Sequence, residues 1–522
     1  MLSRAELGLE APLVQVEVHL ANGLPAFTIV GLPAPVVRES RERVRAALLN
    51  SGFQFPARRI TVNLAPVELS KQGGRYDLPI ALGLLMAGGQ LAAAVSPAVE
   101  CYGELGLGGE LRPVAGLFLA ALHAARAGHA LIVPAASAAE VALSAHPAAY
   151  AVPDLRAAAQ VLRANHDDGI PAMGPLRRIR APATAADSLA AERREGLEEV
   201  VGQWQAKRAL TIAAAGGHSV MLIGPPGSGK SLLATRLPGL LPPLSDGEAL
   251  EVAGVRSLAG QRLEPEHWRE RPFRSPHHTS SAHALVGGGP GLRPGEISLA
   301  HHGVLFLDEL PEFDRRVLEA LREPLESGSI TIARAAARVQ LPARFQLIAA
   351  MNPCPCGYLG DRRETCRCSP TRIERYRQRV SGPLLDRIDL RITVARLAPA
   401  ELAAAAGAGL PSVTLDADSG NEAARAMAAR VRRLQRSGAL CAHLSAAQLR
   451  RCGALPGPTA ALLRRSCQRL ALSGRGVLRV LAVSRTIADL ADSDLIEPAH
   501  LAEAIQLRRP FAPSYCPTSE SM

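Results

Sequence analysis

The feature that most constrains the fold of this chain is a glycine-rich segment, residues 224–231, which reads G-P-P-G-S-G-K-S. It follows four apolar residues, Val220–Ile223, that suit a buried strand, and it precedes a helix-forming run that begins at Leu232. A loop of this composition between a strand and a helix lets backbone N–H groups close around phosphate oxygens, and the helix start adds positive potential. The segment therefore predicts an α/β domain that binds a nucleoside triphosphate.

The residue types in this loop indicate what each side chain contributes. We expect Lys230 to neutralise charge on the β- and γ-phosphates and the Ser231 hydroxyl to bind Mg²⁺. The other expected contacts to the nucleotide come from loop residues Gly224, Pro225, Pro226, Gly227, Ser228 and Gly229.

A second apolar run, Val304–Leu307, ends in the acidic pair Asp308 and Glu309. We expect Asp308 to share the Mg²⁺ with Ser231, and Glu309 to polarise the water that attacks the γ-phosphate. An acidic pair alone is equally typical of an ordinary capped strand end. In combination with the complete phosphate loop, it predicts ATP binding and hydrolysis.

Charge and composition indicate the class of partner. The 522-residue chain carries a formal net charge of +11, which favours a polyanionic partner, nucleic acid above all, although codon bias toward arginine and alanine is an alternative explanation. Aromatic residues make up only 3%, so a grip on DNA should be mainly electrostatic and not based on stacking. The start of the chain lacks a secretory apolar region, and the most apolar stretch, residues 80–95, predicts a core helix too short to span a membrane. We therefore expect a soluble, cytoplasmic protein with reduced cysteines.

The order of periodic segments predicts three domains and two linkers. Alternating strand-like and helical runs indicate an α/β domain over residues 1–165, and the charged, Pro- and Ala-rich residues 166–195 are expected to be a linker. The nucleotide-binding domain should occupy residues 196–395, followed by a second linker over 396–421. A helical domain is expected over 422–522, with helices at 422–435, 445–450, 458–472, 476–491 and 497–508.

Three further stretches carry a family resemblance. Residues 273–280 read F-R-S-P-H-H-T-S, residues 293–301 read R-P-G-E-I-S-L-A-H, and residues 381–389 read S-G-P-L-L-D-R-I-D. With the phosphate loop and the acidic strand, they make the chain resemble the Mg-chelatase-like AAA+ ATPases, specifically the ComM/YifB group, over nearly its whole length. The resemblance implies a hexameric ring with ATP bound between subunits. It also implies a DNA helicase that promotes branch migration, acting on branched or single-stranded DNA during homologous recombination and natural transformation.

The resemblance further implies roles for residues outside the phosphate loop. Asn352 matches the sensor-1 position, which orients the hydrolytic water. Arg479 matches the sensor-2 position, with Arg485 as the weaker candidate. Arg387 matches the arginine finger that reaches into the neighbouring subunit's site, and Arg379 is its rival.

Local pairing of Arg387 with Asp386 or Asp389 is the alternative to the finger role. Residues 326–348 predict a hairpin, which in related rings projects toward the pore. Arg334 and Arg338 near its tip are candidates to contact a phosphate backbone, and a solvated tip is an equal alternative.

Four cysteines are grouped directly after Asn352 as two C-x-C pairs separated by nine residues, namely Cys354, Cys356, Cys366 and Cys368. Four thiolates on one short loop suit tetrahedral zinc. Because C-x-C is tighter than the usual C-x₂-C spacing, reduced thiols without metal are the alternative. For His277 and His278 we expect no acidic or cysteine partner nearby, and therefore a structural or loop-contact role.

The first domain resembles the proteolytic domain of Lon, through residues 103–105, 111–116 and 124–128. Hydrolysis of that type requires a serine nucleophile activated by a lysine. Matching the motifs places Ile80 at the serine position and Phe118 at the lysine position, and neither side chain can attack or transfer a proton. We therefore predict a non-proteolytic scaffold for assembly or for positioning DNA.

Two other classes of function compete with a DNA motor. A chelatase-type chaperone that remodels a protein partner has the same core, because a fold does not fix its function. A structural DNA-binding protein with a vestigial ATPase is opposed by the intact set of expected ATPase residues.

Overall fold

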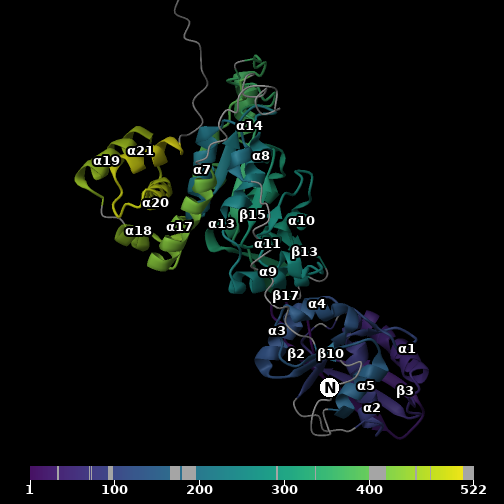
Figure 1. The fold of residues 1–522 in the computed structure, drawn as a ribbon. Helices are drawn as coiled ribbons and strands as arrows, with labels where there is room; N and C mark the ends of the chain where they lie inside the picture. Colours follow the sequence, from purple (N-terminus) through teal and green to yellow (C-terminus); the bar gives the residue numbers. More distant parts are fainter. Residues whose placement is uncertain are drawn as a thin grey trace, which may run out of the picture.

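The computed structural model describes residues 1–31, 35–69, 71, 73–91, 98–164, 177–178, 196–289, 292–334, 337–361, 363–398, 419–452, 455–470 and 472–508. Three units follow one another along the chain: an α/β unit, a second α/β unit with a parallel sheet, and a helical unit (Figure 1). The predicted fold class is confirmed. Most of both predicted linkers, 166–195 and 396–421, lies outside the described residues.

The N-terminal unit is built on an eight-stranded sheet in the order β10-β9-β8-β5-β1-β2-β4-β3. Its strands are β1 (Leu2–Arg4), β2 (Leu13–Ala21), β3 (Ala26–Val30), β4 (Arg59–Ala65), β5 (Val99–Cys101), β8 (Ala130–Pro134), β9 (Ala149–Val152) and β10 (Arg177–Arg178). Strand β2 runs antiparallel to β1 and β4, whereas β5, β8 and β9 are parallel. Within the predicted linker 166–195, β10 pairs with β9 and so extends this sheet by one strand.

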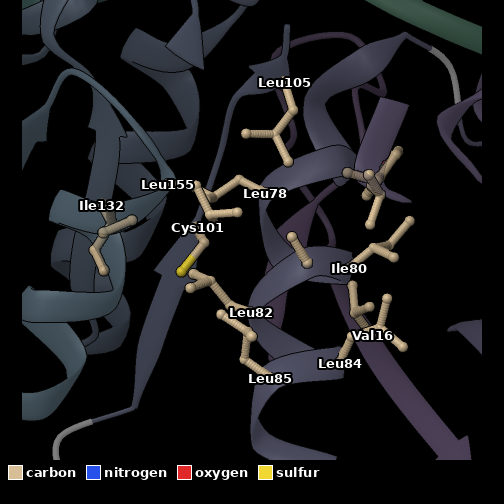
Figure 2. Close-up of a cluster of buried hydrophobic side chains, with 14 of the residues drawn as sticks. Val16, Leu78, Ile80, Leu82, Leu84, Leu85, Cys101, Leu105, Ile132 and Leu155 are labelled. Carbon is tan, nitrogen blue, oxygen red and sulfur yellow. The ribbon is translucent and has the colours of Figure 1, made fainter. Parts of the chain in front are cut away.

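Helices pack on this sheet and bury its apolar residues. They are α1 (Pro35–Asn50), α2 (Asp77–Ala87), α3 (Leu117–Ala127), α4 (Ala138–Ala142) and α5 (Leu155–Ala164). Figure 2 shows side chains of α2, among them Leu78, Ile80 and Leu82, in a cluster that includes Val16 and Cys101. The core helix predicted over residues 80–95 therefore exists, but α2 ends at Ala87 because a pair of glycines follows.

The second unit holds the phosphate loop on a five-stranded parallel sheet in the order β12-β15-β18-β11-β19. The strands are β11 (Val220–Ile223), β12 (Phe273–Arg274), β15 (Val304–Leu307), β18 (Gln346–Met351) and β19 (Leu390–Thr393). The three central strands are buried along their whole length, as continuous apolar runs are when helices cover both faces of a parallel sheet. Since parallel strands share one carboxyl edge, the loops after β11, β15 and β18 meet there.

The predicted hairpin is present as β16 (Ser329–Arg334) paired with β17 (Ala337–Pro342). Strand β17 lies against the N-terminal unit, because a Cβ added to Gly8 would stand 2.5 Å from a methyl carbon of Val339. A second contact joins α3 to α9 (Asp246–Leu258), and beside it the Phe118 and Trp268 rings lie 6.1 Å apart. The first two units are therefore in direct contact (Figure 1).

The third unit is entirely helical within the described residues. It consists of α17 (Ser419–Ser437), α18 (Ala446–Cys452), α19 (Gly457–Leu470), α20 (Gly474–Leu490) and α21 (Pro498–Gln506). Helix α17 packs along α7 (Trp204–Gly216) of the second unit, and α20 contacts α7 as well (Figure 1). A buried ion pair between Arg433 and Asp489 joins α17 to α20. None of the described helices is long and apolar enough to cross a lipid bilayer.

Candidate active site

The phosphate loop connects β11 to α8 (Lys230–Arg236) and has the backbone geometry that its glycines permit. Gly227 and Gly229 have φ values of 73° and 88°, where side chains with a Cβ are strained. Lys230 is buried, and its Nζ donates to the carbonyl oxygens of Gly224 at 2.8 Å and Pro225 at 2.9 Å. Burial lowers the pKa of the Lys230 ammonium, and the carboxylates of Asp308 and Glu309 oppose that shift. A phosphate bound in this loop would place negative charge next to the partly desolvated ammonium of Lys230.

The expected Mg²⁺ ligands come together from two different strands. The Ser231 hydroxyl, at the start of α8, donates to a carboxylate oxygen of Asp308, at the end of β15, at 2.8 Å. Adjacent ligands of an octahedral Mg²⁺ at 2.0–2.1 Å stand about 2.9 Å apart, so these two oxygens fit neighbouring positions of one coordination shell. Two hard oxygen ligands from the protein suit Mg²⁺, because this ion keeps several of its water ligands and also binds nucleotide phosphates.

Glu309 has a strained backbone and an unexpected partner. Its φ is 52°, in the left-handed region, and its own N–H donates to Asp308 at 2.9 Å. Its side chain is half-exposed, and one carboxylate oxygen lies 3.1 Å from Nδ1 of His278. Strain of this kind persists only where the surroundings impose it, and it is common at active sites.

The contact with Glu309 corrects the expectation that no acidic group lies near the paired histidines. Strand β12, which precedes His277 and His278, pairs in parallel with β15, which precedes Glu309, so both segments leave the sheet at the same edge. The two imidazole rings lie 4.1 Å apart, and His277 also bonds to the hydroxyl of Thr279. Only knowledge of the strand order would have identified this partner, because the two segments are not adjacent in sequence.

Asn352 follows the end of β18 and lies beside the phosphate loop, where its Oδ1 accepts a hydrogen bond from Lys230 at 3.2 Å. A cavity of about 500 Å³ opens beside these residues. It is lined by Ser231, Thr235, Phe273, Ser275, Pro276, His277, His278, Phe306, Asp308 and Glu309. The structure thus brings Lys230, Ser231, Asp308, Glu309 and Asn352 to one edge of one sheet.

Arg387 does not lie at this edge within the subunit. It is almost completely buried, and it pairs with Glu326 of α13 (Pro324–Ser327) and donates to the Pro383 carbonyl at 2.7 Å. Arg475 pairs with the same carboxylate. The local partner of Arg387 is therefore Glu326. The sequence had suggested Asp386 or Asp389 instead. The rival candidate, Arg379, is half-exposed and bonds to Glu312 at 2.7 Å.

The two sensor-2 candidates have different surroundings. Arg479 of α20 lies 3.4 Å from a carboxylate oxygen of the buried Asp389 and donates to the Ala442 carbonyl. Burial raises the pKa of Asp389, but the hydrogen bond from His218 and the charge of Arg479 hold it below its ordinary value. Arg485 is fully buried in the helical unit, where it pairs with Asp489. Arg479 thus links the helical unit to the ATPase unit, whereas Arg485 has a role in packing.

A second group of titratable side chains lies apart from this edge. Glu251 of α9 accepts from Nε2 of both His301 and His302 at 2.9 Å. His301 also accepts a hydrogen bond from the Arg344 backbone N–H at Nδ1, so its Nε2 carries the proton. The three side chains are thus hydrogen-bonded to one another. Burial, and then the charge of His302, lowers the pKa of His301 to about 4.

Three family models match successive parts of the chain. The model of magnesium chelatase, subunit ChlI, matches residues 196–402, that of subunit ChlI of Mg-chelatase matches 16–137, and that of the ChlI C-terminal region matches 416–508. A Salmonella typhimurium protein named uncharacterized protein YifB is 47% identical over 97% of this chain and 96% of its own length. The Haemophilus influenzae competence protein ComM has the same identity and coverage. The chain belongs to the ComM/YifB-type Mg-chelatase-like family.

Members of this family carry the AAA+ fold, with which the parallel sheet and the helical third unit agree. More distant similarity extends to the Mg-chelatase 38 kDa subunit of Cereibacter sphaeroides, at 27% identity over 30% of this chain and 51% of that subunit. The family relationship covers all three units and indicates ATPase activity that uses Mg²⁺.

Proposed function

We propose that this protein is an ATP-driven, ring-forming DNA motor that promotes branch migration in homologous recombination and natural transformation. The observation that carries the proposal is the convergence of Lys230, Ser231, Asp308, Glu309 and Asn352 beside one cavity. The net charge of +11 favours a polyanionic substrate. A competence protein among the relatives at 47% identity supports DNA as that substrate.

In the proposed cycle, Lys230 binds the β- and γ-phosphates, and Ser231 with Asp308 holds the Mg²⁺. Glu309 leaves His278 and turns to the attacking water, which Asn352 orients. The neighbouring subunit supplies Arg387, which must first release Glu326, so that ring assembly and turnover are coupled. Arg479 connects the same subunit's helical unit to Asp389, which provides a route for hydrolysis to move that unit.

Contact with DNA is assigned to the hairpin of β16 and β17, in which the side chain of Arg338 is exposed. The side chain of Arg334 lies outside the described residues. Because such contacts are made to phosphates, we expect affinity to fall steeply with salt and to depend little on base sequence.

A chaperone that remodels a protein partner is the second candidate. The observation in its favour is the similarity to the magnesium-chelatase 38 kDa subunit of Cereibacter sphaeroides. That similarity covers only 30% of this chain, whereas the similarity to ComM covers 97%. The motor is therefore the better-supported function.

The deciding experiment measures ATP hydrolysis and strand exchange on a labelled four-way DNA junction, beside a Lys230→Ala variant. The motor predicts ATP-dependent movement of the junction, stimulation of hydrolysis by DNA, and loss of both in the variant. Vigorous hydrolysis with neither DNA stimulation nor junction movement would favour the chaperone.

A further inference from the structure

The loop that follows Asn352 contains a cluster of side chains that the ATP site does not use. The sulfur atoms of Cys354, Cys356, Cys366 and Cys368 all lie within 4.8 Å of one another. We propose that these four thiolates bind one structural Zn²⁺, and that this centre braces the loop against the phosphate loop of the same subunit.

The spacing of the sulfurs matches a tetrahedral metal centre. Cys354 Sγ lies 3.4 Å from Cys356 Sγ and 3.6 Å from Cys366 Sγ, and Cys356 Sγ lies 3.6 Å from Cys366 Sγ. A tetrahedron with Zn–S bonds of about 2.3 Å has edges of about 3.8 Å. A disulfide would need about 2.05 Å, so these pairs are not covalently bonded.

A backbone N–H group within the loop points at one sulfur of the cluster. The backbone N–H of Cys368 donates a hydrogen bond to Cys366 Sγ at 3.5 Å. Hydrogen bonds of this kind orient ligands and stabilise negative sulfur in metal centres.

The local charge also suits a bound tetrathiolate. Four thiolates around one Zn²⁺ leave a net charge of about −2, which needs nearby positive groups. Arg363 and Arg367 belong to the loop itself, and Arg396 is held beside it by an ion pair of 3.3 Å with Asp361. Soft sulfur donors in a tetrahedral set select zinc or iron among the common metals, and zinc needs no redox partner.

The loop touches the phosphate loop directly, which gives the metal a mechanical role. A Cβ added to Gly357 would lie 2.6 Å from Cδ of Pro226, so the two loops meet without space for a side chain. The Arg396 guanidinium lies over the Tyr358 ring at 5.4 Å and donates to the Pro226 carbonyl at 3.3 Å. Fixing the cysteines therefore fixes the wall against which the nucleotide-binding loop packs.

The first test measures metal by mass spectrometry in full-length protein purified without chelator. We compare the wild type with Cys366→Ser and with Cys467→Ser, a matched control on α19 that lies outside the cluster. We expect about one zinc per chain in the wild type and the control, and a loss of at least tenfold in Cys366→Ser. Zinc below about 0.2 per chain, iron in its place, or equal metal in all three proteins would overturn the proposal.

A second test avoids dependence on the folding of the variant. Wild-type protein is stripped of metal and titrated with Co²⁺ alone, whose tetrahedral thiolate complexes absorb visible light. We expect saturable absorption at one Co²⁺ per chain that added Zn²⁺ abolishes. Absence of these bands in stripped protein that retains its helical circular dichroism would contradict the site.

The bracing role has its own readout, which is binding of a fluorescent ATP analogue without turnover. We expect metal removal to weaken binding by about tenfold and Zn²⁺ to restore it, because the phosphate loop loses its support. Unchanged binding in stripped protein would overturn the bracing role. This outcome is distinguishable from failure of the DNA-motor proposal, since no DNA or hydrolysis enters the measurement.

Discussion

The N-terminal unit and the ATPase unit are both α/β. They differ in the side chains that occupy the positions where the sequence resemblance predicts catalytic residues. In the ATPase unit, the carboxyl edge of the sheet gathers lysine, serine, carboxylates and an amide beside a cavity. In the N-terminal unit, Ile80 of α2 lies in an apolar cluster (Figure 2). Phe118 packs against Trp268 of the next unit. The first arrangement keeps polar groups available for chemistry, whereas the second uses the equivalent positions for stability and for a contact between units.

The largest effect should come from Arg387. We expect Arg387→Ala to lower ATP turnover in the assembled protein by about 10³–10⁵-fold, as loss of an arginine finger does. Binding of a fluorescent ATP analogue should remain, because Arg387 lies away from its own subunit's phosphate loop. Arg379→Ala is the matched control, and loss of turnover in the control alone would transfer the finger role to Arg379.

Glu309 should give the next largest effect. We expect Glu309→Gln to lower turnover by about 10²–10⁴-fold while ATP still binds, because only activation of the attacking water is removed. Single-turnover hydrolysis measures this directly. Unimpaired hydrolysis would show that another group activates the water and would remove the main contrast between the two units.

A substitution of Ile80 tests whether this position of the N-terminal unit serves stability and not catalysis. We expect Ile80→Ala to destabilise the N-terminal unit by about 2–5 kcal/mol, as truncation of a fully buried aliphatic side chain does. ATP turnover of the folded fraction should not change. Denaturant unfolding provides the measurement. ATP-dependent peptide cleavage by the wild-type protein would contradict the assignment of this unit as a scaffold.

Acid should destabilise the ATPase unit through His301. Burial, and then the charge of His302, lowers the pKa of His301 to about 4 in the folded protein, whereas the unfolded chain titrates near 6.5. The unfolded state therefore binds the extra proton first, and stability falls by up to about 3 kcal/mol as the pH drops from 6.5 to 4. His301→Gln should show a smaller fall over this range. Identical pH profiles of unfolding in both proteins would contradict the prediction.

The contact between the two units should give the smallest effect. The rings of Phe118 and Trp268 lie 6.1 Å apart at an interplanar angle of 61°, an edge-to-face geometry. A double-mutant cycle with Phe118→Leu and Trp268→Leu should give a coupling free energy of about 1 kcal/mol. A coupling of zero, measured by unfolding, would mean that the two units fold independently.

Elements with strong local patterns were predictable from the sequence. Strand Val220–Ile223, the phosphate loop and the helices of the third unit agree closely with prediction, because apolar runs and glycines encode them locally. The end of the predicted 80–95 helix was wrong, since the pair Gly88 and Gly89 stops it. The roles of the site residues stay predictions, and the structure supplies their positions.

The sequence by itself determined the family, the succession of units and the identity of the phosphate-loop, acidic and cysteine residues, because each is encoded in a short contiguous motif. Only the tertiary structure decided which distant groups meet. The pairing of β12 with β15 brings His278 to Glu309, and the packing of α13 gives Arg387 the partner Glu326. These contacts depend on strand order and helix packing, which join segments that no local pattern connects.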